Sequence, residues 1–204
     1  MKIEVNANSS IRIEAGKVIY FDPFKIEEER HDADIIFVTH DHFDHFSSED
    51  IEKIEKKDTI FVVPECMHSL LDKERVITAV AGEALNVEGF EAEAIPSYNV
   101  GKPFHPKKKG YIGYIVKIEG QRVYVAGDCD ANEDNRKVDC DIALIPIGGK
   151  YTMNYEEAAA LTDVIRPELV IPTHYGDVAG DKEDGKKFKE LVDPSIEVKL
   201  LLYA

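Results

Sequence analysis

Apolar and polar residues alternate in short runs through the first part of the chain, and this pattern predicts β-strands rather than helices. The runs lie at residues 2–5, 10–15 and 17–21. Turn-forming pairs, Asn8-Ser9 and Gly16-Lys17, separate them. Farther on, residues 33–38 are almost all apolar, which is typical of a strand buried on both faces.

Helical signals then alternate with further strand signals. Residues 47–57 begin with two serines, carry acids in the first turn and end in lysines, as an N-capped helix does. Asn154 caps a second helix that stops before Pro167. The other expected elements are a short helix at 64–71, a helix at 181–193, and strands at 59–63, 75–80, 140–146, 168–174 and 196–203.

Two hairpins occupy the middle of the chain. One spans residues 83–96 with its turn at Glu88-Gly89, and the other spans 111–128 with its turn at Glu119-Gly120. The segment between them, 97–110, has two prolines and two glycines, and loops of this length are usually functional or disordered. The order of elements fits a single domain over residues 1–204, built as a two-sheet sandwich with helices outside.

The composition limits the partners and the location that we expect. The formal net charge of −15 repels polyanions, so nucleic acid is a disfavoured partner. No window is apolar for long enough to span a membrane, and the first residues do not have the pattern of a signal peptide. Three cysteines without a CxxC pair indicate a reducing compartment. We therefore expect a cytoplasmic protein without membrane contact, of unspecified oligomeric state.

Metal-capable side chains are concentrated in one turn directly after the apolar run at 33–38. The string HDHFDH holds three of the seven histidines of the chain and two aspartates. Residues two apart at the end of a strand point the same way, so His40 and His42 can converge on one ion while Asp44 and His45 reach a second. Imidazole and carboxylate groups suit zinc, manganese or iron.

Two coordination shells need more ligands than this turn supplies. Asp128 and His174 each follow an expected strand, and His105 lies in the long loop. Asp128 can bridge two ions through its two oxygens, with His105 completing the first site and His174 the second. Each of the three also has an ordinary interpretation, as a turn residue or a surface histidine, but their occurrence together with the histidine turn favours metal binding.

The strings HDHFDH, GDCD and PTHYG resemble the HxHxDH, GD and C-terminal histidine motifs of the metallo-β-lactamase fold, in the same order. This resemblance implies a four-layer αββα sandwich of two mixed β-sheets with a binuclear metal site at one edge. The length and the segments AIPSYNVGKPFHP and LIPIGGKYTMNYEEAA are similar to small zinc-dependent hydrolases of the ascorbate-6-phosphate lactonase-like branch. The DPF string implies that Asp22 orients a ligand histidine.

The resemblance leaves one ligand of the first site open. In many family members the third histidine closely follows its strand, whereas here Tyr98 and Asn99 lie at the strand end and His105 comes later. Either His105 completes the site, or Tyr98 or Asn99 faces the metal or the substrate. Lys150, after a glycine pair, can reach an anionic substrate group or be an ordinary solvated lysine.

The expected cofactors are two divalent ions, zinc first, with manganese or iron as alternatives. They would lower the pKa of a water molecule and supply a hydroxide nucleophile, with Asp44 or Asp128 accepting a proton. The leading hypothesis is a metal-dependent hydrolase of a small, anionic ester, lactone or phosphodiester. The alternatives are a nuclease or phosphodiesterase acting on RNA or DNA, an iron-dependent oxidoreductase of the same fold, and a non-catalytic metal-binding protein.

Overall fold

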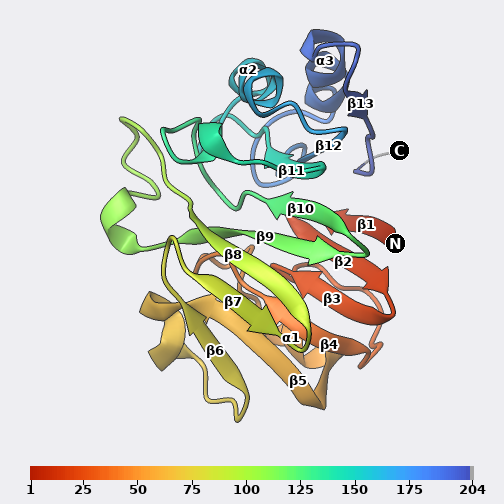
Figure 1. Cartoon of the computed structure of the whole chain (residues 1–204), viewed down its shortest axis with the longest axis vertical. Helices are drawn as coiled ribbons and strands as arrows, with labels where there is room; N and C mark the ends of the chain where they lie inside the picture. Colours follow the sequence, from red (N-terminus) through yellow and green to blue (C-terminus); the bar gives the residue numbers. More distant parts are fainter. Residues whose placement is uncertain (203–204) are drawn as a thin grey trace.

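The strands of the protein form two sheets, seen in Figure 1 in a computed structural model that describes residues 1–202. In the first sheet the strands run in chain order from β1 to β6. Neighbours from β1 to β3 are antiparallel, and those from β3 to β6 are parallel. These strands are β1 (Lys2–Ala7), β2 (Ser10–Ala15), β3 (Lys17–Phe21), β4 (Ala33–Phe37), β5 (Glu55–Pro64) and β6 (Val76–Ala79).

The second sheet has the order β13-β12-β11-β10-β9-β8-β7. Its strands from β7 to β10 are antiparallel neighbours, and those from β10 to β13 are parallel. Both predicted hairpins, β7–β8 and β9–β10, are confirmed. The strands are β7 (Ala84–Val87), β8 (Phe90–Pro96), β9 (Ile112–Ile118), β10 (Gln121–Val125), β11 (Ile142–Pro146), β12 (Leu169–Thr173) and β13 (Glu197–Val198).

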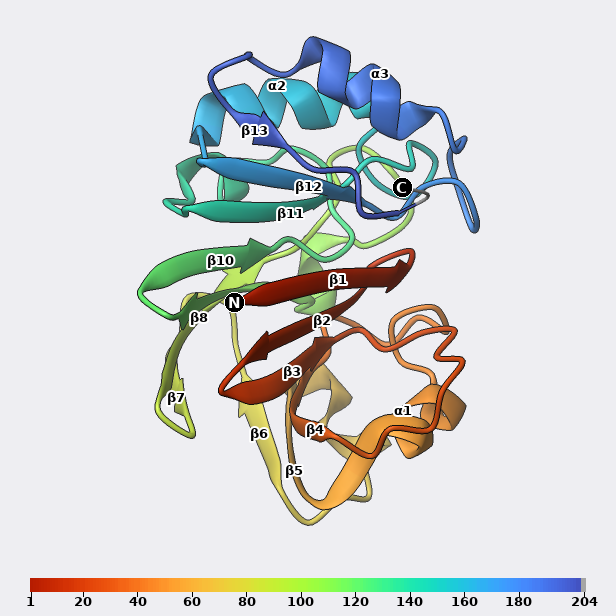
Figure 2. The same ribbon diagram turned by 90° about the vertical axis from the view of Figure 1, so that its right-hand side faces the viewer.

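Helices cover the two outer faces of the sandwich. Figure 2 shows α1 (Ser48–Ile54) against the first sheet and α2 (Tyr155–Ile165) with α3 (Asp184–Leu191) against the second. Ser47 caps α1, and Asn154 begins α2 with a reciprocal capping box. Short 3-10 helices are η1 (Glu65–Leu70), η2 (Lys107–Lys109) and η3 (Asn135–Lys137). The predicted four-layer αββα sandwich is confirmed.

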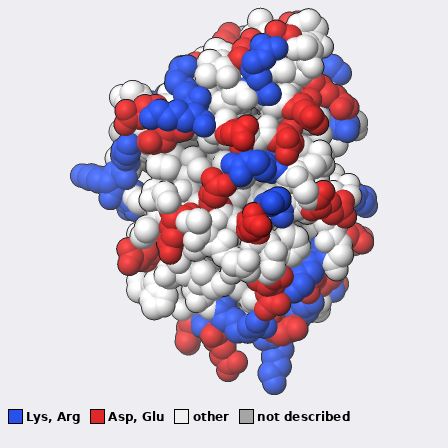
Figure 3. Space-filling model, in the orientation of Figure 1, with Lys and Arg blue, Asp and Glu red and all other residues white. Residues whose placement is uncertain are grey.

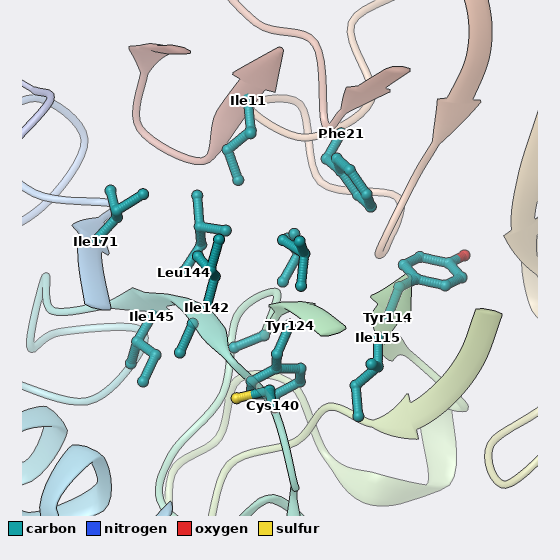
Figure 4. Packing of buried hydrophobic residues seen from close by; sticks show 14 of the residues in the cluster. Ile11, Phe21, Tyr114, Ile115, Tyr124, Cys140, Ile142, Leu144, Ile145 and Ile171 are labelled. Carbon is teal, nitrogen blue, oxygen red and sulfur yellow. The ribbon is translucent and has the colours of Figure 1, made fainter. Parts of the chain in front are cut away.

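Alternate residues of the buried strands face different layers, because successive side chains of a strand point to opposite faces. In β4, Ile35 and Phe37 enter the core between the sheets, whereas Ile36 packs in the smaller cluster under α1. Figure 4 shows the core between the sheets, where Phe21 lies near Tyr114. The rings of Phe37 and Tyr114 are 4.9 Å apart and join the two sheets. This core fixes the relative position of the strand ends that carry the site.

Three predicted elements are shorter than expected by four residues or more. Helix α1 ends at Ile54 because Glu55 already pairs with Ala33 in the first sheet. Helix α3 covers 184–191 rather than 181–193. The expected last strand, 196–203, keeps only two residues in the ladder, and its end at Tyr203 lies outside the described residues. None of the described helices has both the length and the apolar composition needed to cross a membrane.

Candidate metal centre

The polar residues that the sequence singled out lie at the carboxyl ends of parallel strands. Asp22 follows β3, the histidine turn follows β4, and His174 follows β12. Asp128 lies three residues beyond β10. Parallel strands carry their carboxyl ends to a common edge, where a ligand site is favoured. The sandwich brings these ends from both sheets together, so residues more than a hundred positions apart in sequence are in contact.

The first group consists of His40, His42 and His105. One nitrogen atom of each ring lies within 4.8 Å of those of the other two. Nδ1 of His42 is 3.0 Å from Nε2 of His105. The structure thus brings His105 to the histidine turn across the long loop, although it comes nine residues after the end of β8.

The second group consists of Asp44, His45 and His174, whose ligand atoms also lie within 4.8 Å of one another. Oδ2 of Asp44 is 3.1 Å from Nε2 of His174 and 3.6 Å from Nε2 of His45. All three residues are buried. The pairing of Asp44 with His174 joins the two sheets, because the former follows β4 and the latter follows β12.

Asp128 lies between the two groups. Its Oδ2 is 3.5 Å from Nε2 of His105, in the first group, and 3.3 Å from Nε2 of His174, in the second. Its Oδ1 is 3.3 Å from Nε2 of His45. The Asp128 carboxylate is therefore in contact with both groups of candidate ligands.

Asp22 fixes which nitrogen of two histidines carries the proton. A carboxylate can only accept, so Nδ1 of His45 donates to Asp22 Oδ2 at 2.7 Å. The Thr39 hydroxyl donates to the same oxygen at 2.7 Å and therefore accepts from Nδ1 of His40, at 3.0 Å. When these rings are neutral, the proton is on Nδ1, so each ring presents Nε2 to a metal in the centre.

The donor set fits a divalent ion. Nε2 of His40, Nε2 of His45 and Oδ1 of Asp128 are buried without a hydrogen-bond partner in the described structure. Such atoms are costly unless a ligand engages them. A third metal-capable cluster, of Asp22 with His40 and His45, is better explained as support, because both oxygens of Asp22 already accept hydrogen bonds from Thr39. Imidazole and carboxylate ligands in two sets of three suit zinc, and also manganese or iron.

The pKa values within the centre diverge. Burial lowers the pKa of His40 well below its ordinary value, and the neighbouring His45 adds to this. Burial opposes protonation of His174, but the Asp128 and Asp44 carboxylates outweigh it and raise its pKa to about 9. Burial likewise disfavours the charged form of Asp128, yet His174 and His45 hold its pKa well below the usual range. The carboxylate that lies between the groups is therefore ionised.

The long loop is folded back by contacts behind His105. The Tyr151 carbonyl lies 3.2 Å from Nδ1 of His105 and accepts a hydrogen bond from the Asn99 side chain at 2.6 Å. Asn99 thus supports the histidine from behind. Tyr98 is turned away, and its hydroxyl donates to Asp134 at 3.0 Å. Of the alternatives that the sequence left open, the structure brings His105 to the first group and leaves Tyr98 outside the site.

Backbone strain coincides with this centre. Asn8, Asp22, His105 and His174 all have positive φ angles, of 46°, 45°, 51° and 55°. Such angles are uncommon outside glycine and cluster at functional sites, where surrounding contacts hold them. The backbone N–H of His174 donates to the Asn8 carbonyl at 2.9 Å, which joins two of these strained residues.

Besides Thr39, sequence reasoning missed two contributors. Asn8 is fully buried and donates from its side chain to Oδ2 of Asp44 at 3.2 Å. The ring of Tyr111 packs 5.1 Å from that of His40 and 6.0 Å from that of His42, and its hydroxyl donates to Asp41. The only signal for Asn8 was its position in a turn, and none marked Tyr111.

A pocket of about 400 Å³ opens over the two groups. Lys150 is exposed and is not among the residues that line it; its Nζ lies 4.9 Å from the centre of the Tyr151 ring. Cys129, beside Asp128, is buried, and burial raises the pKa of its thiol to about 12, so it stays protonated. The lining residues are Asp41, His42, Phe43, Asp44, Phe104, His105, Asp128, Tyr151, His174 and Val178.

Comparison with known proteins agrees with this geometry. A family model described as a β-lactamase superfamily domain matches residues 2–174. A UPF0173 metal-dependent hydrolase of Thermofilum pendens is 35% identical over 177 residues, which cover 83% of this chain and 75% of the relative. Another, from Thermococcus onnurineus, is 27% identical over 98% of this chain and 96% of its own. A Parabacteroides distasonis structure, assigned as a metal-dependent hydrolase, has a TM-score of 0.83 at 29% identity, covering 97% and 91%.

The fold and the two ligand groups thus define a metal-binding αββα sandwich with its site at the strand ends. The chain belongs to the β-lactamase superfamily. Its curated relatives are named metal-dependent hydrolases, and this chain is an enzyme of that class.

Proposed function

We propose that the chain is a binuclear hydrolase that uses two divalent ions, zinc first, on a small ester, lactone or phosphodiester. The observation that carries the proposal is the position of Asp128, which lies within 3.5 Å of His105 and within 3.3 Å of His45 and His174. One carboxylate in contact with two separate groups of three ligands is the arrangement that a shared pair of ions requires.

Residues of this chain have distinct roles in the proposal. His40, His42 and His105 would hold one ion, Asp44, His45 and His174 would hold the other, and Asp128 would contact both. When bound, such ions lower the pKa of a water molecule and polarise a carbonyl or phosphoryl oxygen. Asp44 or Asp128 would accept the proton released as the reaction proceeds, because a pKa below the ordinary value keeps each of these buried carboxylates ionised and free to accept one.

The supporting residues would keep the ligand atoms in place. Asp22 and Thr39 engage Nδ1 of His45 and His40, which leaves Nε2 of each ring for a metal, and Asn99 supports the carbonyl that faces His105. Asn8 orients the Asp44 carboxylate from the side of β1. Ordering of the ligands before binding is what distinguishes such a centre from a set of surface histidines.

The surface favours a small-molecule substrate over a nucleic acid. Figure 3 shows lysine and arginine interspersed with aspartate and glutamate over one whole face, without a broad basic region. The formal net charge of −15 adds long-range repulsion of polyanions. All three cysteines are free thiols, which supports a reducing, cytoplasmic location.

Metal content per chain tests the binuclear proposal. We would measure it by elemental analysis on wild type and on His42→Ala, His174→Ala and Asp128→Ala, with the exposed His68→Ala as the matched control. We expect two ions per chain in the wild type and the control, one in each histidine variant, and fewer than two in Asp128→Ala.

Each other result has a definite meaning. A single ion in fully loaded wild type would exclude the binuclear mechanism, and no ion after reconstitution would exclude metal-dependent hydrolysis altogether. Iron as the resident metal, together with oxygen uptake, would replace the hydrolase by the oxidoreductase alternative. Cleavage of RNA or DNA with a steep salt dependence would favour the nuclease.

A further inference from the structure

The pocket over the metal groups has walls of a different chemistry from its floor. The candidate ligands His42, Asp44, His105, Asp128 and His174 form the floor. The remaining lining residues are Asp41, Phe43, Phe104, Tyr151 and Val178. Four of these five are apolar or aromatic, and they come from four separate segments: the histidine turn, the loop between β8 and β9, the loop after β11, and the loop after β12.

Two phenylalanine rings that line this pocket are exposed to solvent. Phe43 is 67% exposed and packs edge-on against Phe24, with ring centres 5.9 Å apart. Phe104 is 38% exposed and packs edge-on against Tyr151 at 4.8 Å. Each phenylalanine is next in sequence to a lining residue of the floor, so its ring is held at a fixed place relative to the ligands. Exposed apolar surface that lines a pocket marks a binding site.

The charge of the lining is the second observation. Among the described residues that line the pocket there is no lysine or arginine, and the one charged group beyond the floor is the carboxylate of Asp41. Lys150 lies outside this lining. An anionic substrate group seated against this wall, away from the ions in the floor, would lose its hydration with no side-chain cation to compensate. An apolar group would gain free energy from burial there.

We propose that this pocket takes an uncharged carboxylic ester or lactone that carries an apolar chain or aryl group, seated against Phe43, Phe104 and Val178. The proposal rests on the proposed function and specifies its substrate class. In the reaction, water adds its oxygen to the carbonyl carbon and the ester C–O bond breaks. The electron pair of that bond and one proton go to the leaving oxygen, so the products are a carboxylic acid and an alcohol and no oxidant is needed.

Binding of straight-chain hydroxamic acids tests the apolar wall without turnover. The hydroxamate group chelates the metal. The alkyl chain, varied from two to eight carbons, contacts the apolar residues of the wall. We would measure dissociation constants calorimetrically on zinc-loaded protein. We expect affinity to rise about threefold per methylene group. The eight-carbon compound should bind at least about tenfold more tightly than its analogue with a terminal carboxylate.

Two variants test whether the dependence of affinity on chain length comes from the phenylalanines of the pocket wall. Phe43→Ser and Phe104→Ser should each flatten the dependence on chain length, while the two-carbon compound keeps its affinity. Leu191→Ser, at an equally exposed apolar residue on α3, is the matched control and should leave the dependence unchanged. A wild-type affinity that does not change with chain length, or equal binding of the carboxylate-ended analogue, would overturn the proposal.

Hydrolysis measurements separate this proposal from the proposed function. We would compare kcat/KM for neutral alkyl esters and lactones of increasing length with that for phosphate mono- and diesters. Faster hydrolysis of the phosphate esters would overturn the neutral-substrate proposal and leave the hydrolase standing. Chain-length-dependent hydroxamate binding without hydrolysis of any of these compounds would instead overturn the proposed hydrolase.

Discussion

The Asp22 carboxylate accepts a hydrogen bond from Nδ1 of His45 at 2.7 Å, and through Thr39 it also sets the protonated nitrogen of His40. One buried side chain from β3 therefore orients a member of each ligand group. Asp22 is itself fully buried with a positive φ of 45°, so the fold maintains a strained, desolvated carboxylate at this position.

The first prediction concerns this carboxylate. In Asp22→Asn, one amide position becomes an N–H donor that faces either Thr39 or His45, both of which also donate. We expect the zinc affinity to fall about 10- to 100-fold. Competition with a chromogenic chelator measures it, with the exposed Asp58→Asn as the control. Affinity within twofold of wild type would show that Asp22 has no part in orienting the ligands.

The second prediction concerns the loop that carries His105. The buried Asp130 carboxylate accepts hydrogen bonds from the Val100 N–H at 2.9 Å and from Lys102 Nζ at 2.5 Å. Asp130→Ala leaves the Val100 N–H unpaired and leaves Lys102 Nζ with the Thr152 carbonyl, 2.7 Å away, as its remaining acceptor. We expect the metal-free protein to lose about 1–3 kcal/mol of unfolding free energy in urea. We also expect weaker binding of one ion only, because only the first group depends on this loop.

A stepwise metal titration identifies that ion. The binding step weakened in Asp130→Ala should be the one that His42→Ala removes, and not the one that His174→Ala removes. Lys102→Met, which removes the donor and keeps the aliphatic chain, should reproduce the effect more weakly. Equal weakening of both steps would mean that Asp130 supports the whole centre rather than the His105 loop.

Local sequence patterns were sufficient for the layers of the fold and for the positions of most of the candidate ligands. The histidine turn directly follows the apolar run 33–38. The position of His40 and His42 at the end of a strand could therefore be predicted from the pattern of apolar residues and the place of the histidines after it. Asp128 and His174 could be predicted in the same way, as polar residues directly after expected strands. The position of His105 could be found only from the structure. It lies in an expected loop of fourteen residues, and no local pattern specifies how such a loop folds back.

The missed residues depend on contacts between distant segments. Asn8 meets Asp44 across 36 positions of sequence, because β1 ends beside the histidine turn. Tyr111 reaches Asp41 across 70 positions. Neither contact has a local pattern, since the first joins the segments after β1 and β4 of the first sheet and the second joins the two sheets. The position of Lys150, outside the pocket lining and beside the Tyr151 ring, likewise depends on a loop conformation that spacing does not encode.

The third prediction concerns the protons that the ligand histidines release when a metal binds. The pKa of His174 is raised to about 9, and that of His45 is also raised, against burial, by Asp128 and Asp22. Both imidazoles are therefore protonated in the metal-free protein at pH 7.5, and a metal binds only the neutral form. Metal binding should release at least one proton per chain, and apparent affinity should rise with pH until about pH 9.

Calorimetry in buffers of different ionisation enthalpy counts these protons. The apparent binding enthalpy should vary linearly with the buffer enthalpy, with a slope equal to the number released. Above pH 9 that number should fall, because His174 is then already neutral. A slope of zero at pH 7.5 would show that the ligands are neutral before the metal arrives.

The fourth prediction concerns the glycine pair after β11. A Cβ atom at Gly148 would lie 2.3 Å from the carbonyl oxygen of His174, closer than any tolerated contact. A Cβ at Gly149 would have 3.4 Å of space beside Asn154, but the φ there is +82°. Gly148→Ala must displace His174, whereas Gly149→Ala introduces only backbone strain. Both should destabilise the protein, by about 1–3 kcal/mol for overpacking and about 1–2 kcal/mol for strain.

Metal binding distinguishes the two variants, because His174 belongs to the second ligand group. Gly148→Ala should lose the binding step that His174→Ala removes, while Gly149→Ala should keep both ions with near wild-type affinity. Unfolding free energy and metal affinity are measured on the same preparations. A general loss of structure would lower both quantities in Gly148→Ala and in Gly149→Ala alike. If Gly148→Ala bound two ions normally, the close packing of Gly148 on His174 would serve stability alone, and the second group would tolerate a displaced histidine.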